Sequence, residues 1–230
     1  MKPLLFSFFI VLTLACKSQP DTAQRVNPAT FEKAIHSESV QVLDVRTAGE
    51  FYSGHIKNSL LADWNDKIQF NNRIQYVDKD RPVYIYCLVG GRSAAAAEWM
   101  RKNGYNNVVE LQGGINAWKR ENKPLEGKSE EKQMTQEEYQ AKIPKDKITL
   151  VDFGASWCPP CVKMEPVLDK LQKDTILHFQ IIKVDAGVHT DLMKALGIDP
   201  IPVFIVYKNG KETWRKEGIV TREELIAQLK

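Results

Sequence analysis

The sequence contains few cysteines and no predominant charge. Its four cysteines among 230 residues are too few to build a disulfide scaffold. Its 32 Lys and Arg residues nearly balance 29 Asp and Glu residues and are scattered along the chain, so no basic stripe indicates a nucleic-acid partner. After the first 15 residues, no apolar run approaches the roughly 20 residues of a membrane-spanning helix. The pattern therefore argues against a polytopic membrane protein.

The remaining composition is that of an ordinary folded protein. Hydrophobic residues make up 43% of the chain and charged residues 27%, as in soluble globular domains, so collagen-like and disordered chains are excluded. A chain of this length can form one large domain or two domains of about 100 residues each.

The first 16 residues are typical of a secretion signal. Met1-Lys2 gives a positive start, and residues 3–15 are almost entirely apolar but too short to span a bilayer. The stretch ends in Leu-Thr-Leu-Ala-Cys16 and resembles a bacterial lipoprotein signal, although the Thr stands where that family usually has Leu. The resemblance implies that Cys16 is lipidated and begins the mature chain, followed by a polar spacer at residues 17–26.

A lipid on this cysteine would make the protein extracytoplasmic, in the periplasm or cell envelope, and hold it to the membrane only through the lipid anchor. The alternative is an ordinary cleaved signal, which would release a secreted soluble protein.

A polar segment divides the rest of the chain. Residues 121–133 read ENKPLEGKSEEKQ, show no periodic apolar pattern and contain Pro124 and Gly127, so we interpret them as a linker. If flexible, about 13 residues typically span roughly 20 Å. Residues 27–120 and 134–230 each alternate helix and strand patterns, which predicts two α/β domains.

Periodicity and capping patterns predict the elements of both domains. In the first domain, helices are expected over 28–37, after Thr47 and over 93–103, with strands over 40–45, 83–86 and 108–111. In the second, helices are expected after Thr135, over 158–173, over 190–196 and after Thr221, with strands over 148–153 and 179–184 and a hairpin of 202–207 with 213–216.

The most specific motif is Cys158-Pro-Pro-Cys161, which follows an apolar strand and opens a helix. Two cysteines three residues apart at a helix start can form a disulfide. Free N–H groups and the positive end of the helix dipole favour the thiolate of the first cysteine, and thiolate is the attacking species in disulfide exchange. We therefore expect Cys158 to be the nucleophile and Cys161 the resolving thiol. A zinc site would need a second Cys or His pair, which is absent, so neither metal nor cofactor is expected.

Residues 135–230 resemble thioredoxin. The motifs that carry the resemblance are VDFGASWCPPC at 151–161, Pro166, Ile201-Pro202 and the sequence YKNGKE. The resemblance implies supporting roles for four residues: Pro202 as a cis-proline facing the cysteine pair and shaping a peptide groove, Asp152 as a buried acid assisting proton transfer at the resolving cysteine, Lys183 as its partner, and Trp157 as the aromatic beside the nucleophile, for which packing is an equal alternative.

One departure concerns the redox pair itself. Pro159 replaces the glycine of ordinary thioredoxins, and CPPC is common among extracytoplasmic thioredoxin-like reductases. The resemblance therefore implies protein disulfide clients and a membrane thiol reductant that restores the dithiol, while the redox potential of cytosolic relatives does not transfer.

The third cysteine of interest, Cys87, ends a predicted strand and begins a Cys-x4-Arg loop. Leu88, Val89, Gly90 and Gly91 lie between it and Arg92. The amides of such a loop can point inward at an anion, the two glycines permit a tight turn, and the helix expected from Ser93 places its positive end behind the sulfur. The loop is one residue shorter than the Cys-x5-Arg loop of phosphatases, which favours sulfur chemistry over phosphoryl chemistry.

Residues 27–120 resemble a single rhodanese domain. The motifs are Asp44-Val-Arg46, Glu50-Phe51, Gly54-His55-Ile56, the Cys87 loop and GGINAW at 113–118. The resemblance implies a parallel-sheet domain in which Cys87 carries sulfur as a persulfide. The two apolar residues after the cysteine leave Arg92 as the only charge in the loop, which disfavours doubly charged thiosulfate as donor. We expect Asp44, Arg46 and Glu50 to form a structural polar network and His55 to be packed.

Together these features predict an extracytoplasmic protein-disulfide reductase with sulfurtransferase activity. In the expected mechanism, Cys158 attacks a persulfide on Cys87, which is loaded by a persulfide or another sulfur donor. Two alternatives remain open: a reductase whose rhodanese half is only a binding module, and an oxidase that introduces disulfides into secreted proteins.

Overall fold

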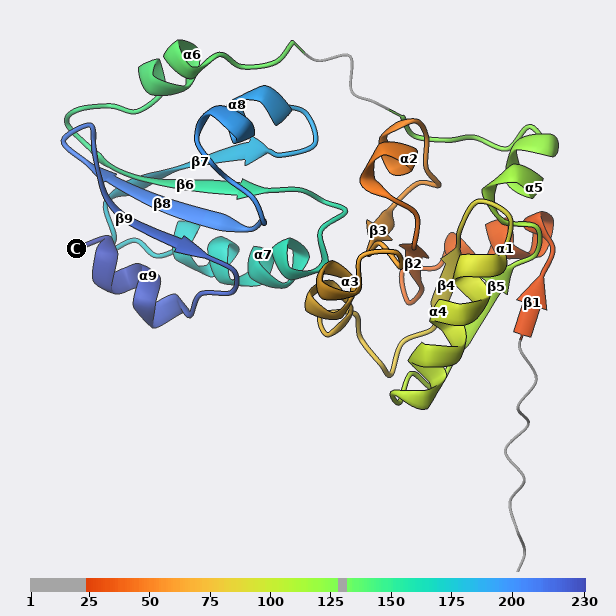
Figure 1. Ribbon diagram of the computed structural model, residues 1–230. Coiled ribbons are helices and arrows are strands. Elements are labelled where there is room, and N and C mark those ends of the chain that lie inside the picture. The colour runs from red at the N-terminus through yellow and green to blue at the C-terminus, as the bar shows by residue number, and fades with distance from the viewer. Residues whose placement is uncertain (1–23, 128–131) are drawn as a thin grey trace, which may run out of the picture.

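The computed structural model describes residues 24–127 and 132–230, and the predicted signal segment and Cys16 lie outside these residues. In the described part, the chain forms two α/β domains side by side, each built on its own sheet (Figure 1), as predicted. No helix in these two ranges combines the length and the apolar character that crossing a bilayer requires.

The first domain is built on a five-stranded parallel sheet. Its strands are β1 (Gln24–Val26), β2 (Gln41–Asp44), β3 (Ser59–Leu61), β4 (Val83–Tyr86) and β5 (Val108–Leu111), and its helices are α1 (Pro28–Ile35), α2 (Ala48–Tyr52), α3 (Lys67–Ile74), α4 (Gly91–Lys102) and α5 (Gly114–Arg120). The strands lie in the order β1-β5-β4-β2-β3. Because all of them run in one direction, the loops that follow β2, β3 and β4 leave the same edge of the sheet.

Both faces of this sheet are buried, as is usual for parallel sheets. One apolar cluster includes Phe70, Ala97 and Met100 beneath α3 and α4. The other includes Phe31 and Trp118 beneath α1 and α5. The helix starts follow local rules: the Thr47 and Glu50 side chains form the expected capping box of α2.

Several elements of this domain differ from the sequence expectation. Gln24–Val26 fall in the predicted spacer but pair with β5 as an edge strand. The three-residue strand β3 and the helix α3 are not predicted, because β3 is too short for a periodic pattern and α3 is largely polar. Helix α4 begins at Gly91 rather than near Ser93. The missed elements β3 and α3 face the second domain.

The second domain has a mixed four-stranded sheet. Its strands are β6 (Ile148–Gly154), β7 (Phe179–Asp185), β8 (Val203–Lys208) and β9 (Lys211–Glu217), and its helices are α6 (Gln136–Ala141), α7 (Pro159–Gln172), α8 (Thr190–Ala195) and α9 (Arg222–Gln228). The order is β7-β6-β8-β9, with β6 parallel to β7 and antiparallel to β8. Helices α7 and α9 cover one face and α6 and α8 the other (Figure 1).

The linker is less free than its composition predicts. The backbones of Glu126 and His55 exchange two hydrogen bonds of 2.7 and 2.8 Å, and the indole N–H of Trp118 donates to the Pro124 carbonyl at 2.9 Å. At the other end, the N–H of Met134 donates to the His189 ring at 3.1 Å. Hydrogen bonds to each domain thus hold both ends of the polar segment, so fewer than the expected 13 residues lie between the fixed points.

Candidate active sites

The cysteine pair of the second domain begins α7. Cys158 is the N-cap residue of this helix and forms a disulfide with Cys161. The N–H of Cys161 donates to the Cys158 sulfur at 3.3 Å, so a free helix-terminal donor already points at the atom that would carry thiolate charge. Cys158 has no exposed surface, and Cys161 is 8% exposed.

The Ile201–Pro202 peptide lies against this pair. Its bond is cis, and the Cys158 sulfur lies 3.8 Å from the Ile201 carbonyl oxygen. The peptide bond between Asp199 and Pro200, two residues earlier, is also cis. The structure thus brings the predicted proline loop to the nucleophile.

Asp152 lies behind the resolving cysteine on β6, in register with Lys183 of β7. Burial raises the pKa of Asp152 to about 6, and the positive charge of Lys183 only partly offsets this rise. Gly154 leaves open space between the carboxyl and the thiol: a Cβ at this position would lie 3.4 Å from Asp152 Oδ1 and 3.6 Å from Cys161 Sγ. A carboxyl with this pKa can exchange a proton near neutral pH.

In the first domain, the Cys87 sulfur lies in a cradle of donors. The N–H of Gly90 donates to the sulfur at 3.1 Å and the Ser93 hydroxyl at 3.4 Å. Burial raises the pKa of the Cys87 thiol, but these bonds, with those from the Ser93 and Val89 amides, outweigh burial and lower the pKa below its usual value. Gly90 has φ 114°, which suits glycine at this turn. The sequence places Ser93 only at a helix start and does not reveal its hydroxyl contact.

The GGINAW segment supports the same loop from behind. The Ile115 N–H donates to the Cys87 carbonyl at 2.9 Å, and that of Asn116 donates to the Leu88 carbonyl at 3.1 Å. Gly114 has a positive φ, and a Cβ there would lie 2.5 Å from the Cys87 carbonyl oxygen. Only glycine therefore permits the close approach of α5 to the loop.

Arg92 does not offer a free charge to the sulfur. Its guanidinium donates two hydrogen bonds to the Glu50 carboxylate at 2.6 and 2.7 Å, and this pairing lowers the pKa of Glu50 to about 2. Glu50 thus pairs with Arg92 of the Cys87 loop and does not form the expected network with Asp44 and Arg46. This corrects the sequence expectation. The positive charge of the loop is largely neutralised.

The contacts of Asp44, Arg46 and His55 are those of structural residues. Arg46 and Asp44 form a fully buried ion pair of 2.7 Å, and Arg46 also donates to the Gly54 carbonyl. His55 stacks on Phe51 with ring centroids 3.7 Å apart. Within the described ranges, no group of three His, Cys, Asp or Glu residues is arranged to hold a metal ion.

Leu88 and Val89 form the exposed surface of the Cys87 loop. They are 37% and 62% exposed, respectively. The solvent-facing side of the loop is therefore apolar, while the amides that face the sulfur lie inside.

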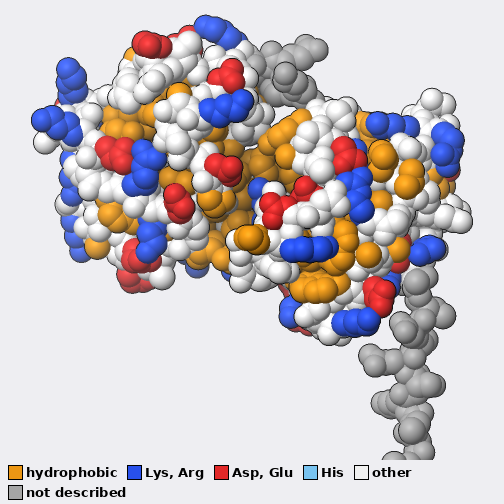
Figure 2. All heavy atoms as spheres, viewed as in Figure 1, with side chains coloured by type: hydrophobic (Ala, Val, Ile, Leu, Met, Phe, Trp, Pro, Cys, Tyr) orange, Lys and Arg blue, Asp and Glu red, His pale blue; other side chains and the backbone are white. Residues whose placement is uncertain are grey.

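The two domains meet at Trp157, the residue before the nucleophilic cysteine. The Leu61 N–H at the end of β3 donates to the Trp157 carbonyl at 2.8 Å. The Trp157 ring contacts Phe51 and Tyr52 of α2, with centroids 6.0 and 5.8 Å away, and the Arg73 guanidinium of α3 lies 5.2 Å from its centroid. Figure 2 shows hydrophobic side chains in the hollow between the two halves. The sequence gives no sign of this contact, because all four partners lie more than 80 residues away in the chain.

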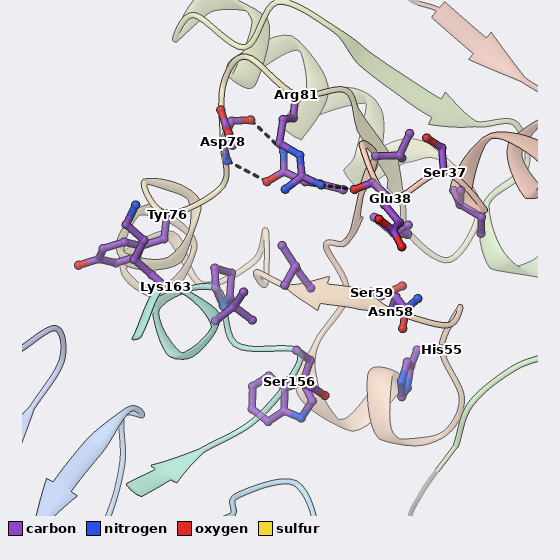
Figure 3. Close-up of a pocket in the computed structure, with 18 of the residues that line it drawn as sticks. Ser37, Glu38, His55, Asn58, Ser59, Tyr76, Asp78, Arg81, Ser156 and Lys163 are labelled. Atoms are coloured by element: carbon purple, nitrogen blue, oxygen red, sulfur yellow. Dashed lines mark hydrogen bonds between the residues drawn. The ribbon is translucent and has the colours of Figure 1, made fainter. Parts of the chain in front are cut away.

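A cleft of about 800 Å³ lies beside this contact. From the first domain it is lined by residues that include His55, Asn58 and Ser59, and from the second by Ser156 and Lys163 (Figure 3). Trp157, Pro159 and Val162 also line it. The cleft therefore reaches the chain neighbours of Cys158 on both sides.

Comparison with known families assigns both halves. Residues 27–121 match the Rhodanese-like domain family, and residues 130–230 match the Thioredoxin family. A sulfurtransferase from Allochromatium vinosum is 34% identical over 94 residues, covering 41% of this chain and 85% of that protein. A thioredoxin from Alicyclobacillus acidocaldarius is 33% identical over 96 residues, covering 42% of this chain and 91% of that protein.

Other similarities concern the same two domains. The chain spans about half the length of the chloroplast thioredoxins that it matches. Among solved structures, a rhodanese-like domain protein from Staphylococcus aureus is 34% identical, with 46% of this chain and 99% of that chain covered and a TM-score of 0.40. The family matches confirm the order of the two predicted domains and support roles in redox and sulfurtransferase chemistry.

Proposed function

Because this chain belongs to the rhodanese family through its first domain and to the thioredoxin family through its second, we propose that it is an extracytoplasmic reductase coupling the two chemistries. In this proposal Cys87 carries sulfur as a persulfide, and the Cys158–Cys161 dithiol reduces that sulfur to sulfide. Protein disulfides are a second class of client. The extracytoplasmic location rests on the signal-like segment that ends at Cys16.

The coupled reaction has two exchange steps. First, the Cys158 thiolate attacks the outer sulfur of the Cys87 persulfide, so that Cys158 becomes the persulfide and Cys87 leaves as thiolate. Second, the Cys161 thiolate attacks the Cys158 sulfur and hydrosulfide leaves, forming the Cys158–Cys161 disulfide. The transferred sulfur gains two electrons and the two thiols lose them. Asp152 accepts the proton of Cys161, and an external membrane thiol reductant restores the dithiol.

The observation that carries this proposal is the hydrogen bond between Leu61 and Trp157. Leu61 and Tyr86 are both in register with Asp44 of the strand between them. They therefore lie two strand spacings, about 10 Å, apart. Cys87 directly follows Tyr86, and Cys158 directly follows Trp157. The contact thus supports a short path between the two sulfur sites.

The loop chemistry supports a donor of low charge. Leu88 and Val89 present an apolar surface, and the charge of Arg92 is paired with Glu50. The loop of residues 87–92 therefore has no unpaired positive charge to bind a doubly charged anion. We propose an uncharged or singly charged persulfide as the sulfur donor.

A single-turnover experiment tests the coupling. Reduced full-length protein is loaded with cysteine persulfide, and sulfide and the Cys158–Cys161 disulfide are measured by trapping and mass spectrometry. We expect one sulfide per disulfide, and no sulfide from Cys87→Ser. In Cys161→Ser, the extra sulfur should remain on Cys158.

Two results would point elsewhere. If the extra sulfur stays on Cys87 while Cys158 remains a free thiol, the domains are not coupled and the first domain is a binding module. A Cys87–Cys158 disulfide formed after peroxide treatment would indicate peroxide sensing through a sulfenic acid instead.

A further inference from the structure

The surface around the second domain's disulfide is already occupied. Trp157, beside the nucleophile, is partly buried and contacts the rings of Phe51 and Tyr52 and the Arg73 guanidinium, all from the first domain. Tyr52 also reaches the β7–α8 loop, where a Cβ on Gly187 would lie 3.5 Å from its ring and 3.0 Å from Trp157 Nε1. Cys158 itself has no exposed surface.

Polar contacts fix the position of this cover. The Leu61 N–H, on the outer edge of β3, donates to the Trp157 carbonyl at 2.8 Å. The Arg73 guanidinium donates to the Leu61 carbonyl at 3.1 Å, which ties α3 to the same strand end. Asp199, next to the proline loop of the second domain, interacts electrostatically with Arg73 across the boundary. Directional bonds, ring contacts and opposite charges therefore act together at one place.

We propose that the first domain is a built-in lid over the CPPC site, which in its closed position slows the access of protein partners to Cys158 more than the access of small sulfur compounds. The lid occupies the surface of Trp157, directly beside the nucleophile, and so competes with any protein that approaches Cys158 from this side. The cleft of about 800 Å³ is lined by Trp157 and Pro159, the two chain neighbours of the buried Cys158, and in this proposal a small molecule approaches from that side. The inference rests on the proposed disulfide exchange at Cys158 but not on sulfur transfer from Cys87.

The test compares two reductants of different size acting on the oxidised full-length chain. The small probe is tris(2-carboxyethyl)phosphine, and the large probe is a separate reduced thioredoxin; loss of the Cys158–Cys161 disulfide is followed by quenching and mass spectrometry. In Tyr52→Ala the lid loses one of its two ring contacts with Trp157. We expect the rate with the protein reductant to rise about tenfold, the factor that corresponds to about 1.4 kcal/mol, and the phosphine rate to change less than twofold.

Matched variants keep the test decisive. Ile68→Ala removes a 77% exposed side chain of α3 and should leave both rates unchanged. Arg73→Gln removes the cation from Trp157 by a change on another helix and should reproduce the effect of Tyr52→Ala. The lid is refuted if neither Tyr52→Ala nor Arg73→Gln changes the ratio of the two rates, or if Ile68→Ala changes it equally. Because no persulfide is involved, failure of the sulfur-transfer proposal leaves this result unaffected.

Discussion

Asp152→Asn should stabilise the second domain at neutral and alkaline pH, although it removes a group that the mechanism uses. Burial raises the pKa of Asp152 from 3.8 to about 6. Between about pH 4 and pH 6, the carboxyl of Asp152 is therefore protonated in the folded state and ionised in the unfolded state. Folding stability contributed by this group is therefore greatest below about pH 4 and falls as pH rises towards 6. At about 1.4 kcal/mol per pH unit, ionisation of Asp152 lowers the free energy of unfolding by about 3 kcal/mol above pH 6.

The assay is urea unfolding of the oxidised full-length chain from pH 4 to 8, read by brief proteolysis and mass spectrometry of peptides from residues 134–230. The variant and the wild type should be equally stable near pH 4 and separate by up to about 3 kcal/mol at pH 8. Asp169→Asn, which changes an exposed carboxylate on α7, should shift stability by less than about 0.5 kcal/mol at either pH. A variant that is less stable than wild type at pH 8 would refute the reasoning, because it would mean that the ionised carboxylate is stabilised by its surroundings.

Four further predictions concern the sulfur sites and the anchor. Ser93→Ala should raise the pKa of Cys87, because it removes a hydrogen bond to the sulfur; thiolate absorbance against pH measures the shift, and an unchanged midpoint would contradict the donor role. Glu50→Gln should free the guanidinium it now neutralises and raise the weak thiosulfate:cyanide turnover severalfold, whereas fast turnover in wild type would contradict the expected donor preference. Cys158→Ser should abolish reduction of insulin disulfides while Cys87→Ser retains most of it, and equal loss in both would argue against an autonomous second domain. Cys16→Ser should release the protein from membranes or block its processing, and a wild-type protein that fractionates as soluble would rule out the lipid anchor.

Local chemistry explains which parts of the site could be predicted from sequence. The helix start at Cys158 follows from a strand, a turn and prolines within a few residues. The Cys87 loop is equally local, since its donors lie within six residues of the sulfur. The pKa of Asp152 required knowledge of burial, which the resemblance supplied before the coordinates did.

Long-range contacts account for what could not be predicted. The partner of Arg92 is Glu50, 42 residues earlier, and no pattern in the sequence distinguishes this pairing from one with Arg46. The contact of Tyr52 with Trp157 joins two domains, and aromatic residues of this kind read as ordinary core positions. The short strand β3 has too few residues for periodicity, yet its edge provides the bond between the domains.

Because the linker is held at both ends, the first domain competes strongly with protein clients for the face around Trp157. Between Glu126, bound to His55, and Gln133, whose side chain bonds Asp191 and Thr190, only six residues remain. Fully extended, they separate these two points by at most roughly 25 Å. When the lid opens, the two domains therefore stay tethered at short range. The effective concentration of the first domain at the second is then on the order of millimolar. The apparent Kd of a protein that binds the same face is its intrinsic Kd divided by the open fraction, so only tightly binding or locally abundant clients would be served.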